Sequence, residues 1–139
     1  MTPANGTPAN PKAMIFWILW FAILSGLLMI QFLAKGGVPK LENPEDASIL
    51  FPAIGLGMAM ASMAVRFVVI PRLDSLEKKL PLMIIGLAMA ESIGVLGAFV
   101  VPPEEGASRL FMLVLAVVCI VVSAPVYVNS GKNKNPFVN

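Results

Sequence analysis

Histidine is absent from this 139-residue chain, and cysteine occurs only once, as Cys119. The lack of histidine excludes a His-ligated haem and the usual zinc sites. A single cysteine forms no disulfide within the chain, and we interpret Cys119 as a small apolar packing residue. No nucleophile–base pair or metal-ligand cluster is evident, so we expect neither an enzyme nor a bound organic cofactor.

Charge is also scarce, and hydrophobic residues take its place. Charged residues make up 13% of the chain, whereas soluble domains average about 25%. Hydrophobic residues make up 58%, compared with roughly 45–50% in soluble domains. This composition is typical of a membrane protein, so membrane lipid is the first expected partner. The net charge of +2 gives no reason to expect a nucleic acid partner.

Four long apolar stretches account for this composition. They cover residues 13–34, 49–71, 80–101 and 110–127. Each approaches the roughly 20 residues that a helix needs to cross a bilayer core, and the absence of water there requires helical backbone. We therefore predict an all-α, integral membrane four-helix bundle, in which Pro125 ends or kinks the last helix.

The segments outside these stretches set the predicted domains and topology. Residues 1–12 are predicted to be a disordered tail, 13–128 the transmembrane domain and 129–139 a second tail. Basic residues favour one side of the membrane, and this bias predicts that both termini face the cytoplasm. That side carries Lys12, Arg66, Arg72, Lys78, Lys79, Lys132 and Lys134, whereas the other carries Lys35, Lys40 and Arg109. Trp17 and Trp20 are expected near the cytoplasmic headgroups.

Glu91 is the only acidic residue inside an apolar stretch. A carboxylate in hydrocarbon costs several kcal/mol unless it is protonated, paired or bound to a cation. Glu91 is therefore the main candidate site, for a proton or a sodium ion, and no other metal site is expected. Counting residues from the central loop places Ser62 near its depth, so the Ser62 and Ser92 hydroxyls could serve as ligands. Arg66 is a candidate charge partner, or it extends to the inner headgroups.

Small residues recur in the second and third apolar stretches. Membrane helices associate largely through close packing over such residues, because lipid gives little hydrophobic drive between them. A helical hairpin packed through these positions is therefore expected. The positions are Gly55, Gly57, Ala59 and Ala61 in the second stretch and Gly86, Ala90, Gly94 and Gly97 in the third.

Together these residues resemble the proteolipid c subunit of rotary ATP synthases. The alternating Gly55-x-Gly57-x-Ala59-x-Ala61 is similar to that family's first helix, and the segment from Gly86 to Gly97 is similar to the region of its ion-binding carboxylate. The Glu91-Ser92 pair is similar to the form in sodium-binding rings. The resemblance implies a c-subunit-like hairpin over residues 50–101, Glu91 as the ion site and Ser92 as a ligand.

The chain departs from the family pattern in several places. The Arg-Gln-Pro-Glu loop that binds the central stalk is replaced by residues 72–77, so coupling to a rotor is not implied. Met58 stands near the position of the expected glutamine, and Leu96 replaces the usual tyrosine. The first and last helices have no counterpart in a single hairpin. This pattern resembles small bacterial membrane proteins, so the expected location is the bacterial inner membrane.

Two functions remain open from the sequence. In the first, the chain is a small oligomeric proteolipid in which Glu91 binds a proton or sodium ion. In the second, it is a structural or accessory subunit of a larger membrane complex, with Glu91 protonated or paired to Arg66. The first expects copies of the chain as partners, and the second expects other membrane subunits.

Overall fold

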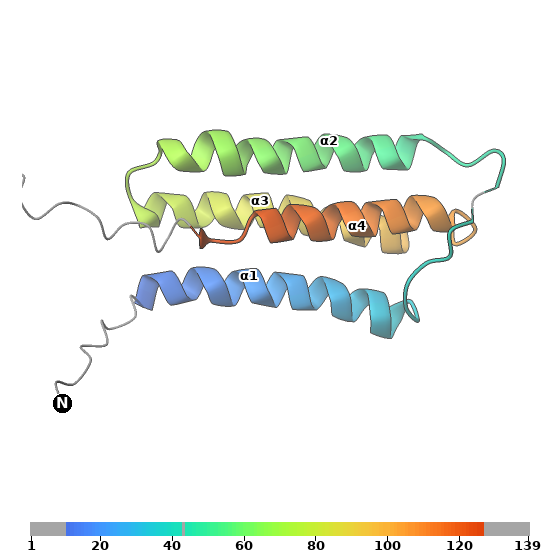
Figure 1. Cartoon of the computed structure of the whole chain (residues 1–139), viewed down its shortest axis with the longest axis horizontal. Coiled ribbons are helices and arrows are strands. Elements are labelled where there is room, and N and C mark those ends of the chain that lie inside the picture. Colours follow the sequence, from blue (N-terminus) through green and yellow to red (C-terminus); the bar gives the residue numbers. More distant parts are fainter. Residues whose placement is uncertain (1–10, 43, 127–139) are drawn as a thin grey trace, which may run out of the picture.

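The computed structural model describes residues 11–42 and 44–126 and is entirely helical in its regular structure there. Four helices lie side by side (Figure 1). They are α1 (Pro11–Met29), α2 (Leu50–Ala64), α3 (Leu76–Phe99) and α4 (Gly106–Val122). A π-helical turn, Ile30–Ala34, extends α1; another, Val65–Val69, extends α2 and leads into a 3₁₀ turn, Ile70–Arg72.

The predicted helical bundle is confirmed for the described residues. Three helical spans, Ala13–Leu33, Leu50–Arg72 and Leu76–Phe99, are long and apolar enough to cross a membrane. α4 is equally apolar in character but has only 17 residues. The chain therefore has the long apolar helices expected of a membrane protein. That α4 forms a fourth membrane span remains a prediction.

The third helix begins four residues before its predicted start at residue 80. Ser75 has extended backbone, and its hydroxyl accepts a hydrogen bond from the Lys78 amide. This is the geometry of an N-cap, which allows the helix to start at Leu76. The preceding 3₁₀ turn ends at Arg72, so only three residues separate it from the start of α3.

The ends of α1 and α4 also differ from the prediction. α1 starts at Pro11, so the last two residues of the predicted disordered tail are helical. Proline is well accommodated in a first helical turn, where its missing N–H has no partner to lose. α4 starts at Gly106, four residues before the predicted 110, and ends at Val122, five residues before the predicted 127. Pro125, which was predicted to end or kink this helix, lies three residues after its end. The tail predicted at 129–139 and residues 1–10 lie outside the described part of the chain.

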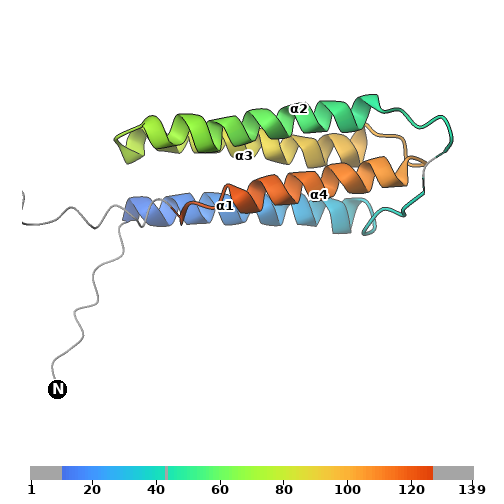
Figure 2. The ribbon, with the colours of Figure 1, turned by 45° about the horizontal axis from the view of Figure 1, so that its top comes forward.

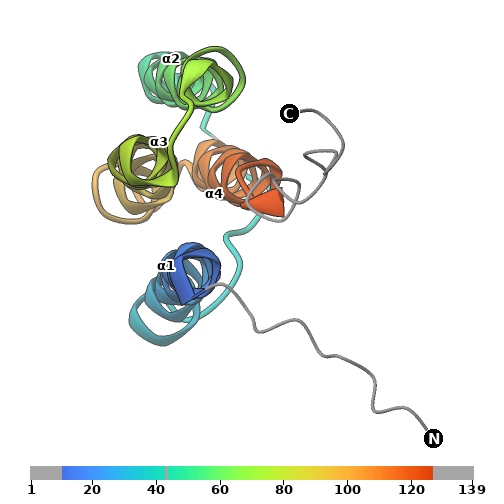
Figure 3. The ribbon, with the colours of Figure 1, turned by 90° about the vertical axis from the view of Figure 1, so that its left-hand side faces the viewer.

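Helices α3 and α4 form the middle of the bundle, with α2 on one side and α1 on the other (Figure 3). α1 and α3 run in the same direction, and α2 and α4 run opposite to them (Figure 1). The connections at residues 35–49 and 100–105 lie together at one end (Figure 2), here called the long-loop end. The opposite end, with the short connection from α2 to α3, is the turn end.

The core lies where α3 meets its three neighbours. Leu87, Ala90 and Ile93 of α3 and Ala116 and Ile120 of α4 are completely inaccessible to solvent. Large apolar side chains cover the outside, including those of Phe21, Leu33, Met60 and Phe67. An apolar exterior around a packed helical core is what a lipid environment requires.

Candidate functional site around Glu91

Glu91 lies on the side of α3 that faces α1. Its Oε1 is 3.9 Å from the point where a Cβ atom would stand on Gly26, so the carboxyl is next to bare α1 backbone. The side chain is half-buried. Within the described residues it forms no hydrogen bond and no ion pair. The carboxyl thus lies between two apolar helices, and none of the residues that the structure describes neutralises it.

The Ser62 hydroxyl is directed to a different level of α3. It is fully buried and donates a hydrogen bond of 2.8 Å to the carbonyl oxygen of Gly86, five residues before Glu91. Five residues correspond to about 7.5 Å along a helix. The structure therefore does not bring Ser62 and Glu91 together. The predicted depth match was wrong because α3 starts earlier, at Leu76, which moves Glu91 further from the turn end.

The Ser92 hydroxyl also turns to main chain. It donates to the carbonyl oxygen of Ala88 on its own helix, at 2.7 Å. This is the back-bonding that serine commonly adopts inside helices. Ser92 therefore follows Glu91 in sequence, but its proton is directed one turn back along α3 and not to the carboxyl.

Arg66 reaches α4 and not Glu91. Its Nε and Nη2 donate to the carbonyl oxygens of Val122 and Ala124, at 3.5 and 3.1 Å. The last carbonyls of a helix lack intrahelical donors, and a positive charge near them also favours the helix dipole. Arg66 thus caps the C-terminal end of α4, and no Arg66–Glu91 pair is found in the described residues.

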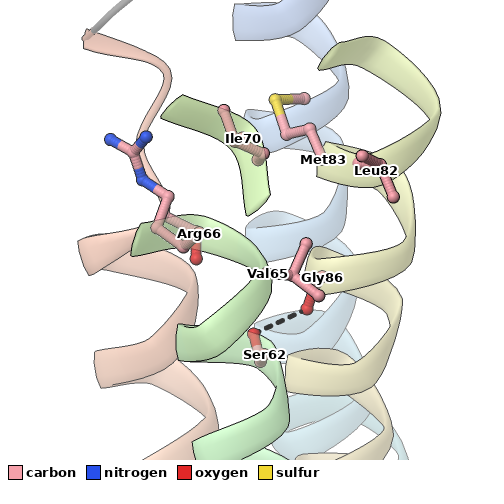
Figure 4. A pocket seen from close by; sticks show the side chains of 8 residues that line it. Ser62, Val65, Arg66, Ile70, Leu82, Met83 and Gly86 are labelled. Atoms are coloured by element: carbon pink, nitrogen blue, oxygen red, sulfur yellow. Dashed lines mark hydrogen bonds between the residues drawn. The ribbon is translucent and has the colours of Figure 1, made fainter. Parts of the chain in front are cut away.

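A small cavity lies beside this cap (Figure 4). It is bordered by Ser62, Gly86, Arg66 and Ser123 together with apolar side chains of α2 and α3, and its volume is about 10 Å³. A space of this size holds about one water molecule. The Ser62–Gly86 hydrogen bond closes one side of it (Figure 4). The cavity is too small for an organic ligand and does not reach Glu91's contact with α1.

Only part of the predicted small-residue strip on α2 packs inside the bundle. Gly55 and Ala59 are buried, and a Cβ on Gly55 would lie 3.4 Å from Ile93 of α3. Gly57 is exposed, with nothing within 4 Å of its would-be Cβ, and Ala61 is half-buried. The predicted alternation is therefore split between an inner face and an outer face.

The small residues of α3 all pack inside the bundle. Gly94 is the most crowded, because a Cβ there would lie 2.5 Å from Leu27 of α1 and 3.2 Å from Ala116 of α4. A Cβ on Gly97 would lie 2.9 Å from Met112. Gly86 and Ala90 are buried as well. These positions let the neighbouring helices approach α3 closely. The predicted packing against the second helix is seen at Gly86, whereas Gly94 and Gly97 pack against α1 and α4.

Three structural residues were not identified from the sequence. Trp20 donates from Nε1 to the carbonyl oxygen of Ile120 in the last turn of α4, at 2.6 Å. Arg109 donates to the carbonyl oxygens of Gly97 and Ala98 near the end of α3, at 3.2 and 3.4 Å. Glu105 is buried just before α4. The position of Arg109 near the start of a helix was the available signal in the sequence. Using it requires knowing which helix ends beside it, and the sequence does not give that packing order.

No family model matches the chain, and neither a curated protein nor a solved structure gives a significant match. Within residues 11–42 and 44–126, no group of three or more His, Cys, Asp or Glu side chains is arranged to hold a metal ion. The interpretation of Glu91 therefore depends on its surroundings in this chain.

Proposed function

We propose that this chain is a small integral membrane protein in which Glu91 binds and releases a proton. The observation that supports this is the half-buried carboxyl between α3 and Gly26 of α1, which lacks a protein partner in the described residues. An ionisable residue at membrane depth is costly when charged and unpaired, so protonation is its simplest neutral state. The partly exposed side chain leaves the carboxyl reachable from outside the bundle.

A proton fits these surroundings better than a sodium ion does. Hard cations are held by several oxygen ligands at once. The hydroxyls of Ser62 and Ser92 are directed to the carbonyls of Gly86 and Ala88. Glu91 thus has neither of the two hydroxyl ligands that the sequence suggested, whereas proton binding needs only the carboxyl itself.

We also propose that the protein acts as a homo-oligomer, in line with its resemblance to c subunits. The outward position of Gly57 on α2 leaves a close-approach point on the lipid-facing side. The bundle's own helices contact the opposite face of α2 through Gly55 and Ala59. Copies of the chain are the partner that this arrangement favours.

Labelling with a hydrophobic carbodiimide tests the proton site, because the reagent modifies carboxyls that are protonated and reachable from lipid. Purified protein in lipid nanodiscs would be labelled between pH 5 and 9, with and without sodium, and the modified residue identified by mass spectrometry. We expect labelling at Glu91 that decreases as pH rises and does not respond to sodium. Glu91→Gln should abolish it, whereas Glu104→Gln, which removes an exposed acid at the long-loop end, should leave it unchanged.

Other outcomes would replace the proposal. Protection by sodium at constant ionic strength would assign a sodium site to Glu91. An absence of labelling at every pH would favour the second candidate, a structural subunit in which the carboxyl is sealed. One observation supports that second candidate: α1, which has no counterpart in a c-subunit hairpin, covers the Glu91 side of α3 at Gly26.

A further inference from the structure

α1 is the least buried of the three long apolar spans. Only 11% of its most apolar window is buried in the bundle, compared with 22% for the α2 span and 44% for α3. Among the described side chains of α1, Phe16 and Leu27 are the buried ones. Leu27 directly follows Gly26, which lies next to Glu91. The position of α1 beside the carboxyl therefore depends largely on how Leu27 packs.

Leu27 occupies a hollow on α3 that Gly94 leaves open. A Cβ on Gly94 would lie 2.5 Å from Cδ1 of Leu27 and 3.2 Å from its Cδ2. The leucine thus fills the space in which a side chain at position 94 would stand. Gly94 is three residues after Glu91, and residues three apart lie on one face of a helix. One face of α3 therefore carries both the hollow that holds α1 and the carboxyl that α1 covers.

Gly26 is the part of α1 that lies over this carboxyl. The distance of 3.9 Å from its would-be Cβ to Glu91 Oε1 is an ordinary van der Waals contact. A methyl group would fit there, whereas a longer side chain would extend over the carboxyl. The span Ala13–Leu33 contains no charged residue, so α1 affects Glu91 by covering it and not by pairing with its charge.

We propose that α1 is a cover that controls access to Glu91. Gly26 sets the size of the opening, because its missing side chain leaves the carboxyl half-buried and not enclosed. Leu27 in the Gly94 hollow keeps the cover in place. The inference rests on the proposed proton site, since access matters for a carboxyl that exchanges its proton. Gly26 and Leu27 are positioning residues, and neither supplies a group that binds the proton.

Polar contacts attach the two ends of α1 independently of Leu27. Towards its start, the Trp20 indole donates to the carbonyl oxygen of Ile120 at 2.6 Å. Just after its π-helical extension, the Lys35 ammonium lies 4.2 Å from the centroid of the Phe99 ring, which is a cation–π contact. A change at the Leu27 contact should therefore displace the middle of α1 without releasing the whole helix.

The rate of carbodiimide labelling at Glu91 tests this inference. It would be measured at one acidic pH in nanodiscs for the wild type and for variants of the full chain. We expect Gly26→Leu to slow labelling several-fold, because the added side chain would cover the carboxyl. Gly94→Ala should accelerate it several-fold, because the added methyl would push Leu27 out of the hollow. Ala22→Leu is the matched control: it adds a leucine at an exposed position one turn earlier on α1 and should leave the rate unchanged.

The outcomes separate the cover from the proton site. Equal rates in all four proteins would overturn the cover and leave the proton site standing. Labelling that is absent from the wild type but present in Gly94→Ala would support the cover and argue against an exchangeable proton. An absence of labelling in every variant would overturn both.

Circular dichroism of each variant shows whether faster labelling reports a displaced α1 or a loss of helix. Faster labelling of Gly94→Ala that is accompanied by lost helix would count against the cover. If Gly26→Leu does not fold, Gly26→Ala takes its place, because its methyl meets Oε1 at an ordinary contact distance. That variant should slow labelling to a smaller extent, and an unchanged rate would overturn the role of Gly26.

Discussion

The Arg66 guanidinium donates from Nη2 to the carbonyl oxygen of Ala124 at 3.1 Å. This contact joins the end of the α2 span to the residues that follow α4, and a second donor, Nε, is directed to Val122. An arginine of the α2 span thus donates hydrogen bonds to the C-terminal end of a different helix. At the opposite end of the bundle, Arg109 donates in the same way to carbonyl oxygens near the end of α3. The C-terminal ends of α3 and α4 are thus each bound by an arginine from another part of the bundle.

Replacing Arg66 with alanine should lower the free energy of unfolding by about 1–3 kcal/mol, because charge-assisted hydrogen bonds to orphan carbonyls are lost. The measurement is reversible unfolding in mixed micelles, followed by circular dichroism. Arg72→Ala is the control: Arg72 is exposed, and its loss should change stability by less than about 0.5 kcal/mol. Equal effects of the two variants would contradict the capping role.

Trp20→Phe should destabilise the protein by about 1 kcal/mol, since it removes the indole donor to Ile120. Trp17→Phe provides a matched control, because Trp17 and Trp20 contact each other edge to face with centroids 5.8 Å apart. Both variants disturb that ring contact, but only the first loses the hydrogen bond. The same micelle unfolding assay should therefore show a larger loss for Trp20→Phe, and the reverse order would argue against the bond.

Gly94→Val should cost about 1–3 kcal/mol, because the added atoms would overpack the junction with Leu27 and Ala116. Gly57→Val, on the outer face of α2, should leave the monomer's stability within about 0.5 kcal/mol. If Gly57 also lies in the proposed homo-oligomer contact, its valine variant should dissociate at a higher protein concentration than the wild type does. Analytical ultracentrifugation in detergent separates this effect from unfolding, and an unchanged oligomer would remove Gly57 from the contact.

Ser62→Ala should lower the free energy of unfolding by about 0.6–1.7 kcal/mol, the range for hydrogen bonds between membrane helices. Ser92→Ala should be close to neutral, because its hydroxyl bonds only within α3. Neither change should affect carbodiimide labelling of Glu91 at low pH. A loss of labelling in Ser62→Ala, with the fold intact by circular dichroism, would place that hydroxyl at the carboxyl after all.

Apolar length and turn residues were enough to predict the number of helices and where most of them end. Pro125 follows the end of α4 as the sequence predicted, and the stretch lengths placed most helix ends within about five residues. The small residues of α3 were predicted to pack for the right reason, which is close approach of backbones in lipid. Such features are local, so they can be recognised without knowing the neighbours.

The surroundings of Glu91 could not be predicted in the same way. An error of four residues in the start of α3 moved Ser62 to the wrong level, since each residue adds about 1.5 Å of height. α1 is apolar on all sides, so its sequence does not say that Gly26 meets Glu91. The partner of Arg66 depends on where α4 stops, and Glu105 becomes notable only once the 35–49 loop is seen to cover it.

The shortness of α4 has a consequence for the bilayer itself. Its 17 residues span about 25 Å, less than the roughly 30 Å of an average hydrocarbon core, whereas the 24 residues of α3 span about 36 Å. If α4 crosses the membrane as predicted, it forms a short side of the bundle. Lipids beside it would compress, and lipids beside α3 would stretch unless that helix tilts. Such hydrophobic mismatch costs a fraction of a kcal/mol per Å, with α4 matching a thin bilayer and α3 a thicker one, so acyl-chain length is expected to influence where this protein accumulates.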